Sequence, residues 1–297
     1  MNKCVAIIDI GTNSIKLLVA NQERTLLDTI RGSRIGEGIA QKKFIISKPI
    51  IERNIQAIHE LLNEAEAFKP DHVIITGTSA VRDAENSKEF CQEVKKATGY
   101  DVRVLSGEEE ATIIAKGVAT DPNVEAFNEF CHFDLGGGSL ECIHYQNQPE
   151  SRVLFAESYP LGIVRLTEKF ITNPAIKIPQ KELLRVQDFI EEELPNFPIK
   201  NLPLVATGGG LSTTKNILKT GPILHLNDLE DLLNILSNIT VEERIAVYQI
   251  PTFRADVMPT ALMIIITLAK KANAKSIIHS SFNLRYGLAE EYFRSTS

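Results

Sequence analysis

Two short segments of glycine and small polar residues carry residue types that could bind phosphate. Each lies between two apolar runs and has the same pattern: Asp9-Ile-Gly-Thr-Asn-Ser14 and Asp134-Leu-Gly-Gly-Gly-Ser139. Glycine and small polar residues let backbone N–H groups converge on an anion, whereas three glycines in a row would weaken an ordinary strand pair. A plain hairpin turn would be favoured for one copy alone. Two matched copies favour phosphate binding by Gly11, Thr12, Asn13, Ser14, Gly136, Gly137, Gly138 and Ser139.

A second pair of similar segments adds Gly208 and Gly209 to these candidates. The segment LVATGGGLS at 204–212 resembles VIITGTSAV at 73–81, at nearly the same offset as the first pair. Cations follow the small-residue turns, and arginine can bind phosphate in a bidentate manner. Each cation alone is more often a solvated surface charge. We expect one cleft to be lined by Lys16, Arg82, Arg165 and Lys215.

Two aspartates end the strands that precede the glycine turns. Asp9 and Asp134 follow apolar runs, and a buried carboxylate without a partner is costly. A hydrated Mg²⁺ between the two halves of the chain would satisfy both. The alternative is that each aspartate caps its own turn through an Asx bond. The metal-linked role is favoured for Asp134, and for Asp9 both interpretations stay open.

Three consecutive glutamates begin one expected helix. Carboxylates favour the positive end of a helix, and Glu109 completes a capping box with Ser106. These effects account for Glu108 and Glu109 without any catalytic role. Glu110 lies one position deeper and has no capping function. It could point into a cleft and activate a water molecule as a general base.

Strands and helices must alternate to position these residues. Apolar residues at steps of three and four predict a helix over 51–65, and Asn86 is expected to cap another that ends near Gly99. Antiparallel hairpins at the Asp-x-Gly turns predict mixed sheets within α/β layers. The remaining expected strands are 73–75, 102–105 and 276–279. The remaining expected helices are 106–119, 181–194, 211–219, 227–238, one capped by Thr240 and Glu243, 255–272 and 284–294.

The internal repeat predicts a duplicated α/β domain. A chain of 297 residues is long for a single core, and the matched turns recur in each half. We expect an N-terminal lobe over 1–122 and a C-terminal lobe over 123–297. The C-terminal helix at about 284–297 is a candidate to join the first lobe.

Composition excludes several classes of function. The net charge of −6 argues against a nucleic-acid partner, for which a basic surface is expected. No apolar tract is long enough to span a bilayer, and the N-terminus lacks a signal-peptide pattern, so we expect a cytoplasmic protein with no membrane partner. The scattered histidines lack zinc-binding spacing. Reduced thiols are expected for Cys4, Cys91, Cys131 and Cys142.

Seven motifs follow one another along nearly the whole chain: Asp9-Ile-Gly-Thr-Asn-Ser-Ile-Lys-Leu-Leu18, Thr78-Ser-Ala-Val-Arg-Asp-Ala-Glu-Asn86, Leu105-Ser-Gly-Glu-Glu-Glu-Ala111, Phe133-Asp-Leu-Gly-Gly-Gly-Ser-Leu-Glu141, Leu161-Gly-Ile-Val-Arg-Leu-Thr-Glu168, Arg254-Ala-Asp-Val257 and Ser281-Phe-Asn-Leu-Arg-Tyr-Gly287. In this order they resemble the motifs of the exopolyphosphatase and guanosine pentaphosphate phosphatase (Ppx/GppA) family. The resemblance implies a duplicated ribonuclease H-like fold of the actin-like ATPase type, with a cleft between two lobes of mixed sheet flanked by helices.

The resemblance also implies an activity and the roles of individual residues. It implies an exopolyphosphatase that releases orthophosphate from the end of inorganic polyphosphate, with guanosine pentaphosphate as the alternative substrate. Glu110 would be the catalytic base and Arg82 would contact phosphate, while Asp134 and Glu141 would be associated with Mg²⁺. A homodimer is the expected assembly. A small-molecule kinase of the same superfamily, or a non-catalytic sensor of polyphosphate or guanosine alarmones, are the competing interpretations.

Overall fold

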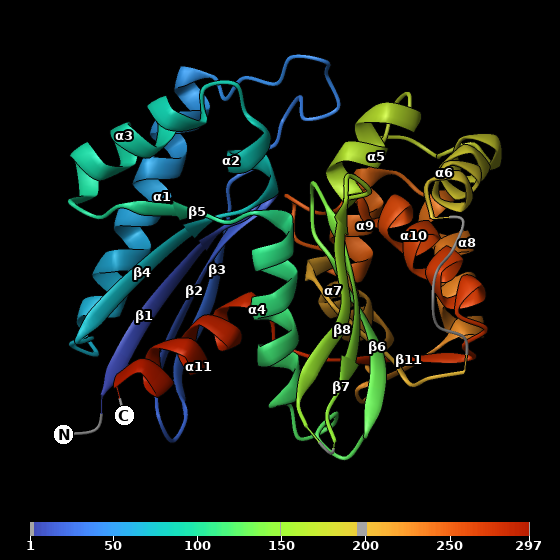
Figure 1. Cartoon of the computed structure of the whole chain (residues 1–297). Coiled ribbons are helices and arrows are strands. Elements are labelled where there is room, and N and C mark those ends of the chain that lie inside the picture. Colours follow the sequence, from blue (N-terminus) through green and yellow to red (C-terminus); the bar gives the residue numbers. More distant parts are fainter. Residues whose placement is uncertain (1–2, 149, 195–200, 297) are drawn as a thin grey trace. The chain divides into compact units, whose positions relative to one another are not determined.

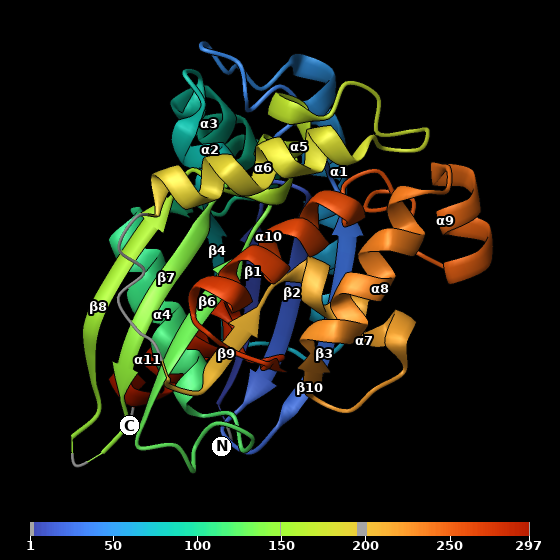
Figure 2. The ribbon, with the colours of Figure 1, turned by 90° about the vertical axis from the view of Figure 1, so that its right-hand side faces the viewer.

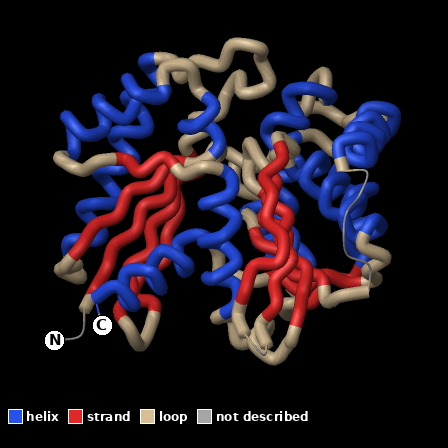
Figure 3. The backbone as a smooth tube through the Cα atoms, viewed as in Figure 1, coloured by secondary structure: helices blue, strands red, loops and turns tan. Residues whose placement is uncertain are grey.

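The computed structural model describes residues 3–148, 150–194 and 201–296 (Figure 1). The chain divides into two units, each with its own sheet and helices, as the coloured tube shows (Figure 3). The first unit contains Met1–Val118 together with Phe282–Ser297, and the second contains Ala119–Ser281. The predicted fold class, α/β with two mixed sheets flanked by helices, is confirmed.

The sheet of the first unit has the strand order β3-β2-β1-β4-β5. Its central strand β1 runs antiparallel to β2 and parallel to β4, so the sheet is mixed as the hairpin predicted. Every residue of β1 is buried, which fits an apolar run covered on both faces. The strands are β1 (Cys4–Ile10), β2 (Ser14–Asn21), β3 (Thr25–Gly32), β4 (His72–Gly77) and β5 (Val102–Val104).

Helices cover both faces of this sheet. Helix α1 lies against β1 and β2 on one face, and α11 packs on the same two strands from the other (Figure 1). Helix α1 begins earlier than expected because Pro49 is compatible with a first helical turn. The helices are α1 (Lys48–Glu66), α2 (Ser79–Asp83), α3 (Ser87–Thr98), α4 (Gly107–Ala119) and α11 (Leu284–Thr296).

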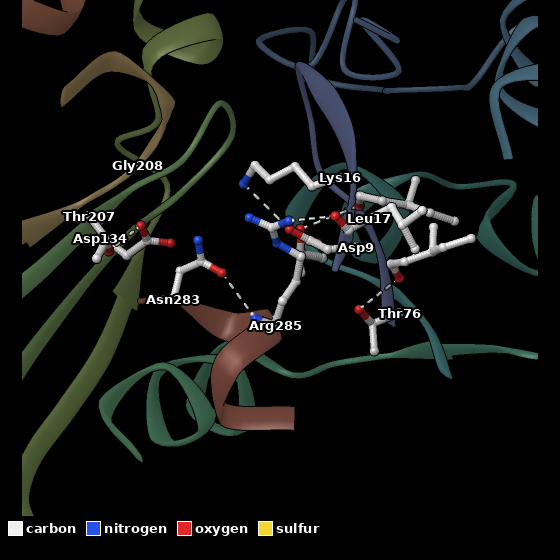
Figure 4. Close-up of polar contacts among 12 residues, drawn as sticks. Asp9, Lys16, Leu17, Thr76, Asp134, Thr207, Gly208, Asn283 and Arg285 are labelled. Carbon is white, nitrogen blue, oxygen red and sulfur yellow. Dashed lines mark hydrogen bonds and ion pairs between the residues drawn. The ribbon is translucent and has the colours of Figure 1, made fainter. Parts of the chain in front are cut away.

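Arg285 fastens the C-terminal helix to the first sheet. Its guanidinium donates to the main-chain oxygen of Leu17 at 3.0 Å (Figure 4) and to the carboxylate of Asp28 at 2.6 Å. A methyl group on Gly287 would lie 1.9 Å from the main-chain oxygen of Ile113. Glycine is therefore needed where α11 crosses α4. The last motif of the chain thus builds the first unit, because it holds α11 on the helix that carries Glu110.

The second unit repeats the first strand order and extends it by one strand. Its sheet has the order β10-β11-β9-β6-β7-β8, in which β6 to β9 and β11 correspond to β1 to β5. Strand β6 runs antiparallel to β7 and parallel to β9. The strands are β6 (Glu129–Leu135), β7 (Leu140–Gln146), β8 (Arg152–Tyr159), β9 (Leu204–Thr207), β10 (Ile223–His225) and β11 (Ser276–His279).

Helix α10 is the centre of the helical layer of the second unit. It is buried from Met258 to Ala269, as expected of a helix that is apolar on all sides. Figure 2 shows it between α6 and α8. The helices are α5 (Ile163–Phe170), α6 (Gln180–Glu193), α7 (Gly209–Leu218), α8 (Leu226–Ser237), α9 (Val241–Tyr248) and α10 (Met258–Lys271). No helix of the described ranges is long and apolar enough to span a membrane.

Local sequence signals were confirmed at two helix ends and wrong at a third. Ser106 and Glu109 form the predicted capping box, and so do Thr240 and Glu243. Asn86 precedes α3 as predicted, but its side chain does not cap that helix. Its amide instead pairs with the main-chain N–H and oxygen of Ile46, both at 2.9 Å. A tertiary partner far along the chain has replaced the local one.

Arg244 on α9 is a fully buried cation bonded to carbonyl groups of three segments. Its guanidinium donates to the main-chain oxygens of Leu236 at 2.8 Å, Pro174 at 3.0 Å and Ala255 at 3.1 Å. Burial lowers its pKa to about 10. It therefore joins the ends of α8 and α9 to the loops on either side.

Replacing Arg244 by methionine should destabilise the protein by about 3 kcal/mol or more, because several buried carbonyl oxygens lose a charged donor at once. Thermal unfolding followed by circular dichroism measures the loss. Arg152→Met is the control, since Arg152 is exposed and makes one side-chain bond to Gln146. Equal melting temperatures for the two variants would contradict the structural role of Arg244.

Candidate active site

The candidate residues of the first unit gather at one edge of its sheet. Strands β1, β4 and β5 are parallel, so their carboxyl ends meet at the same edge. The turn from Gly11 follows β1, α2 with Arg82 follows β4, and α4 with Glu110 follows β5. Ligands bind preferentially at this edge in α/β proteins. The structure therefore brings a predicted phosphate turn, a cation and the predicted base to one edge.

The first glycine turn is held from behind by the segment that follows β3. Gly11 N–H closes the turn by donating to the oxygen of Ser14 at 3.1 Å. The oxygen of Thr12 accepts from the N–H of Gly36 at 2.9 Å, and the oxygen of Asn13 accepts from two further N–H groups of that segment. Thr12 and Ser14 are buried. The turn is therefore a fixed structure in which the carbonyl oxygens of Thr12, Asn13 and Ser14 already accept hydrogen bonds.

The second glycine turn has the same closing bond and a different support. Gly136 N–H donates to the oxygen of Ser139 at 3.1 Å, as Gly11 does to Ser14. The oxygens of Gly136 and Gly137 accept from main-chain N–H groups at the start of α5, at 3.0 and 2.7 Å. Within the described residues, no hydrogen bond from the N–H groups of Gly137 and Gly138 is found. An anion-binding nest requires main-chain N–H groups that are available to the anion, while the neighbouring carbonyl oxygens are hydrogen-bonded elsewhere.

Gly162 allows α5 to support the second turn. A methyl group there would lie 2.3 Å from the carbonyl carbon of Gly138 and 2.4 Å from its nitrogen. Neither backbone atom can move without moving the turn. The sequence singled out the motif that contains Gly162 but not this residue. Only the close approach of two chain segments reveals its function.

Substituting alanine for Gly162 should displace the second turn and lower the apparent affinity for phosphate substrates. Overpacking against backbone costs about 1 to 3 kcal/mol, so the melting temperature should fall as well. Gly221→Ala is the matched control, because a methyl group at Gly221 would meet no atom within 4 Å. A Gly162→Ala protein with an unchanged KM would show that the turn tolerates displacement.

Glu110 and Arg82 form an ion pair within the first unit. The Nη1 atom of Arg82 lies 2.9 Å from Oε2 of Glu110 and donates to the main-chain oxygen of Leu105, also at 2.9 Å. The Glu110 side chain is 7% exposed and that of Arg82 is 23% exposed. The arginine therefore offsets the cost of burying the carboxylate. The two residues to which the sequence assigned catalysis, 28 positions apart, contact each other.

Asp9 faces a lysine across the first hairpin. It lies directly opposite Lys16 in the β1–β2 register, and Lys16 Nζ is 3.4 Å from Oδ2 of Asp9 (Figure 4). The other oxygen, Oδ1, is buried and accepts no hydrogen bond from the described residues. A cation from the protein itself thus takes one side of the carboxylate. Metal binding by Asp9 stays a prediction.

Asp134 faces a second carboxylate at the equivalent position of the second hairpin. It lies directly opposite Glu141 in the β6–β7 register, so both side chains stand on one face of the sheet. Glu141 is fully buried, and its Oε1 accepts from the hydroxyl of Ser158 at 2.7 Å. Two opposed ionised carboxylates repel each other, and a cation between them would relieve that repulsion. This donor set fits Mg²⁺, which often takes one or two protein carboxylates and completes its shell with phosphates and water.

The described residues contain no group of three or more histidine, cysteine, aspartate or glutamate side chains placed to hold a metal ion. All four cysteines are free thiols, and burial raises the pKa of Cys131 to about 12. Neither finding conflicts with a magnesium site of two carboxylates. The metal residues therefore stay a prediction with a suitable donor set.

Thr207 and His132 lie beside Asp134. Thr207 stands opposite Asp134 in the parallel β6–β9 register, and its hydroxyl donates to Oδ1 of Asp134 at 2.5 Å (Figure 4). His132 Nε2 lies 2.9 Å from the same hydroxyl oxygen. His132 is fully buried, and burial lowers its pKa to about 3. The sequence did not single out either residue, and the turn Thr-Gly-Gly was the one signal that could have found Thr207.

The third turn begins helix α7. Gly208 has a φ of +120°, and a methyl group there would lie 2.3 Å from the oxygen of Leu135, so only glycine fits. Arg254 packs its guanidinium on Gly209 and donates to the hydroxyl of Thr213 at 3.0 Å. Burial lowers the pKa of Arg254 to about 10. Arg254 begins one of the motifs that carry the family resemblance, and the structure shows that it adjoins this turn.

The remaining predicted cations are divided between the units. Arg165 lies at the second turn, where its Nε donates to the oxygen of Gly138 at 2.8 Å. Lys215 lies on α7, near enough to His279 to lower that residue's pKa together with burial, which is the larger cause. Lys16 and Arg82 belong to the first unit. That all four line one cleft stays a prediction.

Comparison with known proteins identifies relatives over nearly the whole chain. A family model described as the Ppx/GppA phosphatase family matches residues 15–294. Exopolyphosphatase 1 of Mycobacterium bovis is 25% identical, over 96% of this chain and 86% of that protein. The crystal structure of an exopolyphosphatase from Cytophaga hutchinsonii superposes with a TM-score of 0.88 at 25% identity, covering 99% of this chain and 98% of that one.

A further relative is a longer protein. The bifunctional 3-dehydroquinate synthase/phosphatase of Fusobacterium nucleatum is 28% identical over 253 residues, which are 80% of this chain. The matched part is 37% of that protein. The chain therefore spans little more than a third of that relative's length.

Proposed function

Because this chain belongs to the Ppx/GppA phosphatase family, we propose that it is an exopolyphosphatase, which hydrolyses the terminal phosphoanhydride of inorganic polyphosphate and releases orthophosphate. The observation that carries the proposal is the ion pair between buried Glu110 and partly exposed Arg82, at the strand edge that also holds the first glycine turn. A carboxylate can activate the attacking water, and a guanidinium can stabilise the charge of the transferred phosphoryl group, so both side chains suit phosphoanhydride hydrolysis.

Glu110 would orient the attacking water and accept its proton. Arg82, which touches Oε2 of Glu110, would donate to the terminal phosphoryl group while still bonded to the oxygen of Leu105. Main-chain amides of the glycine turns, among them those of Gly137 and Gly138, would bind the non-bridging oxygens. Such preorganised donors stabilise the charge that spreads over the phosphoryl group during transfer.

Asp134 and Glu141 would hold a Mg²⁺ ion, and Asp9 is the third residue proposed for it. Bound there, the ion would neutralise charge on the phosphate oxygens and so assist departure of the shortened chain. The opposed register of Asp134 and Glu141 supports this assignment. Asp9 has weaker support, because Lys16 already neutralises one of its oxygens.

The decisive experiment compares specificity constants, measured as orthophosphate release, for short polyphosphate, long polyphosphate and guanosine pentaphosphate, with and without Mg²⁺. We expect the highest kcat/KM with polyphosphate and a strong requirement for Mg²⁺. A higher constant for guanosine pentaphosphate would reassign the substrate within the family. Phosphorylation of an added sugar by ATP, or binding of polyphosphate without turnover, would overturn the hydrolase proposal.

We also propose that the protein acts as a cytoplasmic homodimer, as the family resemblance implies. Light scattering coupled to size-exclusion chromatography measures the mass directly. A mass near the 33.0 kDa of one chain would reject the dimer.

A further inference from the structure

The hydroxyl of Thr207 links a buried histidine to the aspartate at the second glycine turn. Its oxygen lies 2.5 Å from Oδ1 of Asp134 and 2.9 Å from Nε2 of His132. The sheet sets this contact, because Thr207 stands opposite Asp134 in the β6–β9 register. His132 lies two residues before Asp134 on β6, and alternate residues of a strand share one face.

Proton counting fixes the direction of both bonds. A hydroxyl has one proton, and an ionised carboxylate only accepts. Thr207 therefore donates to Asp134, and its oxygen must accept from His132. His132 then carries its ring proton on Nε2. Its Nδ1 is buried and has no partner among the described residues, which fits the nitrogen without a proton.

The first unit offers an internal comparison at the same register. Thr76 stands opposite Asp9 as Thr207 stands opposite Asp134. Ile7 occupies the place of His132, two residues before the aspartate. The hydroxyl of Thr76 lies 3.4 Å from the main-chain oxygen of Ile8 and is not bonded to Asp9 (Figure 4). Where the histidine is missing, the threonine turns to the backbone.

We propose that His132 and Thr207 are positioning residues that hold Asp134 in the orientation required for Mg²⁺ binding. His132 Nε2–H directs the hydroxyl proton of Thr207 to Oδ1, and Thr207 in turn fixes the rotation of the carboxylate. Partners of metal-binding carboxylates commonly act in this way, and their loss lowers metal affinity about 10- to 100-fold. This inference rests on the proposed metal role of Asp134.

The test measures Mg²⁺ binding to the intact chain by isothermal titration calorimetry, without substrate. Thr207→Val removes the hydroxyl and keeps the shape, and His132→Leu removes the donor. Each should weaken Mg²⁺ binding about tenfold or more. The conservative variants Thr207→Ser and His132→Gln keep a hydroxyl and an N–H donor, so both should stay within about threefold of the unchanged protein.

The double variant separates positioning from a general structural role. If His132 acts through the Thr207 hydroxyl, His132→Leu with Thr207→Val should bind Mg²⁺ no more weakly than Thr207→Val alone. Additive losses, or a loss in Thr207→Val without one in His132→Leu, would overturn the proposal for His132. If Asp134→Asn leaves Mg²⁺ affinity unchanged, the metal assignment of the proposed function itself has failed.

A spectroscopic measurement tests the direction of the hydrogen bonds from His132 to Thr207 and from Thr207 to Asp134. It does not depend on whether His132→Leu folds well. Nitrogen-15 resonances of the histidine rings distinguish a ring with the proton on Nε2 from one with the proton on Nδ1. His132→Gln identifies the signals of His132 by their disappearance. We expect the Nε2–H form in the unchanged protein at neutral pH. The Nδ1–H form would reverse the hydrogen bonds and overturn the inference.

Discussion

Replacing Glu110 by glutamine should lower kcat for polyphosphate hydrolysis by about 10²- to 10⁴-fold, the usual contribution of a general base. Glutamine cannot accept the proton of water at neutral pH. Its amide oxygen can still accept from Arg82, which lies 2.9 Å from Glu110. The fold and the binding of polyphosphate should therefore persist. Initial rates of orthophosphate release give kcat, and a separate binding measurement gives the affinity for polyphosphate.

Glu108→Gln provides the matched control. Glu108 lies on the same turn of α4 and is exposed, whereas Glu110 is 5% exposed. Both substitutions remove one negative charge near the start of the helix, so a loss of the helix-dipole effect would appear in both. We expect Glu108→Gln to keep nearly full activity. Equal rates for the two variants would eliminate Glu110 as the base.

Asp134→Asn should lower activity about 100-fold or more at a Mg²⁺ concentration that saturates the unchanged enzyme. A metal contributes several kcal/mol to charge stabilisation, and each ~1.4 kcal/mol is a factor of ten in rate. Asparagine keeps the size of the side chain and can still accept from Thr207. Titration with Mg²⁺ should show a higher half-saturating concentration, with part of the lost activity recovered when the ion is in excess.

Glu129→Gln serves as the control for this variant. Glu129 lies at the opposite end of β6 and pairs with His144. The substitution therefore removes a carboxylate from the same strand, but away from the glycine turn. It should leave the Mg²⁺ dependence unchanged. A similar shift in both variants would mean that net charge alone sets the dependence, and an unshifted Asp134→Asn would refute the metal assignment.

The strands and helix ends that the sequence predicted depend on local interactions, which explains why these predictions were reliable. Apolar runs before the Asp-x-Gly turns predicted paired strands, and β1–β2 and β6–β7 have that antiparallel register. The capping boxes at Ser106 and Thr240 formed because both partners lie within one helical turn. The strands that the sequence did not indicate include β3 (Thr25–Gly32), β8 (Arg152–Tyr159) and β10 (Ile223–His225), which are partly exposed and lack a long apolar run.

The roles of single residues could likewise be predicted where they depend on residues nearby in the chain, and not where they depend on distant residues. The sequence located the glycine turns, because the same pattern of small residues recurs in both halves of the chain. For Glu110, spacing alone left open whether the residue is structural or catalytic. The family resemblance assigned it the catalytic role. Without the family resemblance, nothing in the sequence distinguishes Glu141 from an exposed strand residue, yet it is fully buried opposite Asp134. Its environment depends on its neighbours across the sheet.

The sequence by itself determined the duplicated α/β plan and the turns that carry its glycines, since these depend on residues close together in the chain. Only the tertiary structure decided which distant groups meet. It paired Arg82 with Glu110, placed Gly162 against Gly138 and joined Thr207 to Asp134. It also paired the Asn86 side-chain amide with the backbone of Ile46, so that this amide does not cap α3. Such contacts depend on strand order and close packing, which no local pattern of residues encodes.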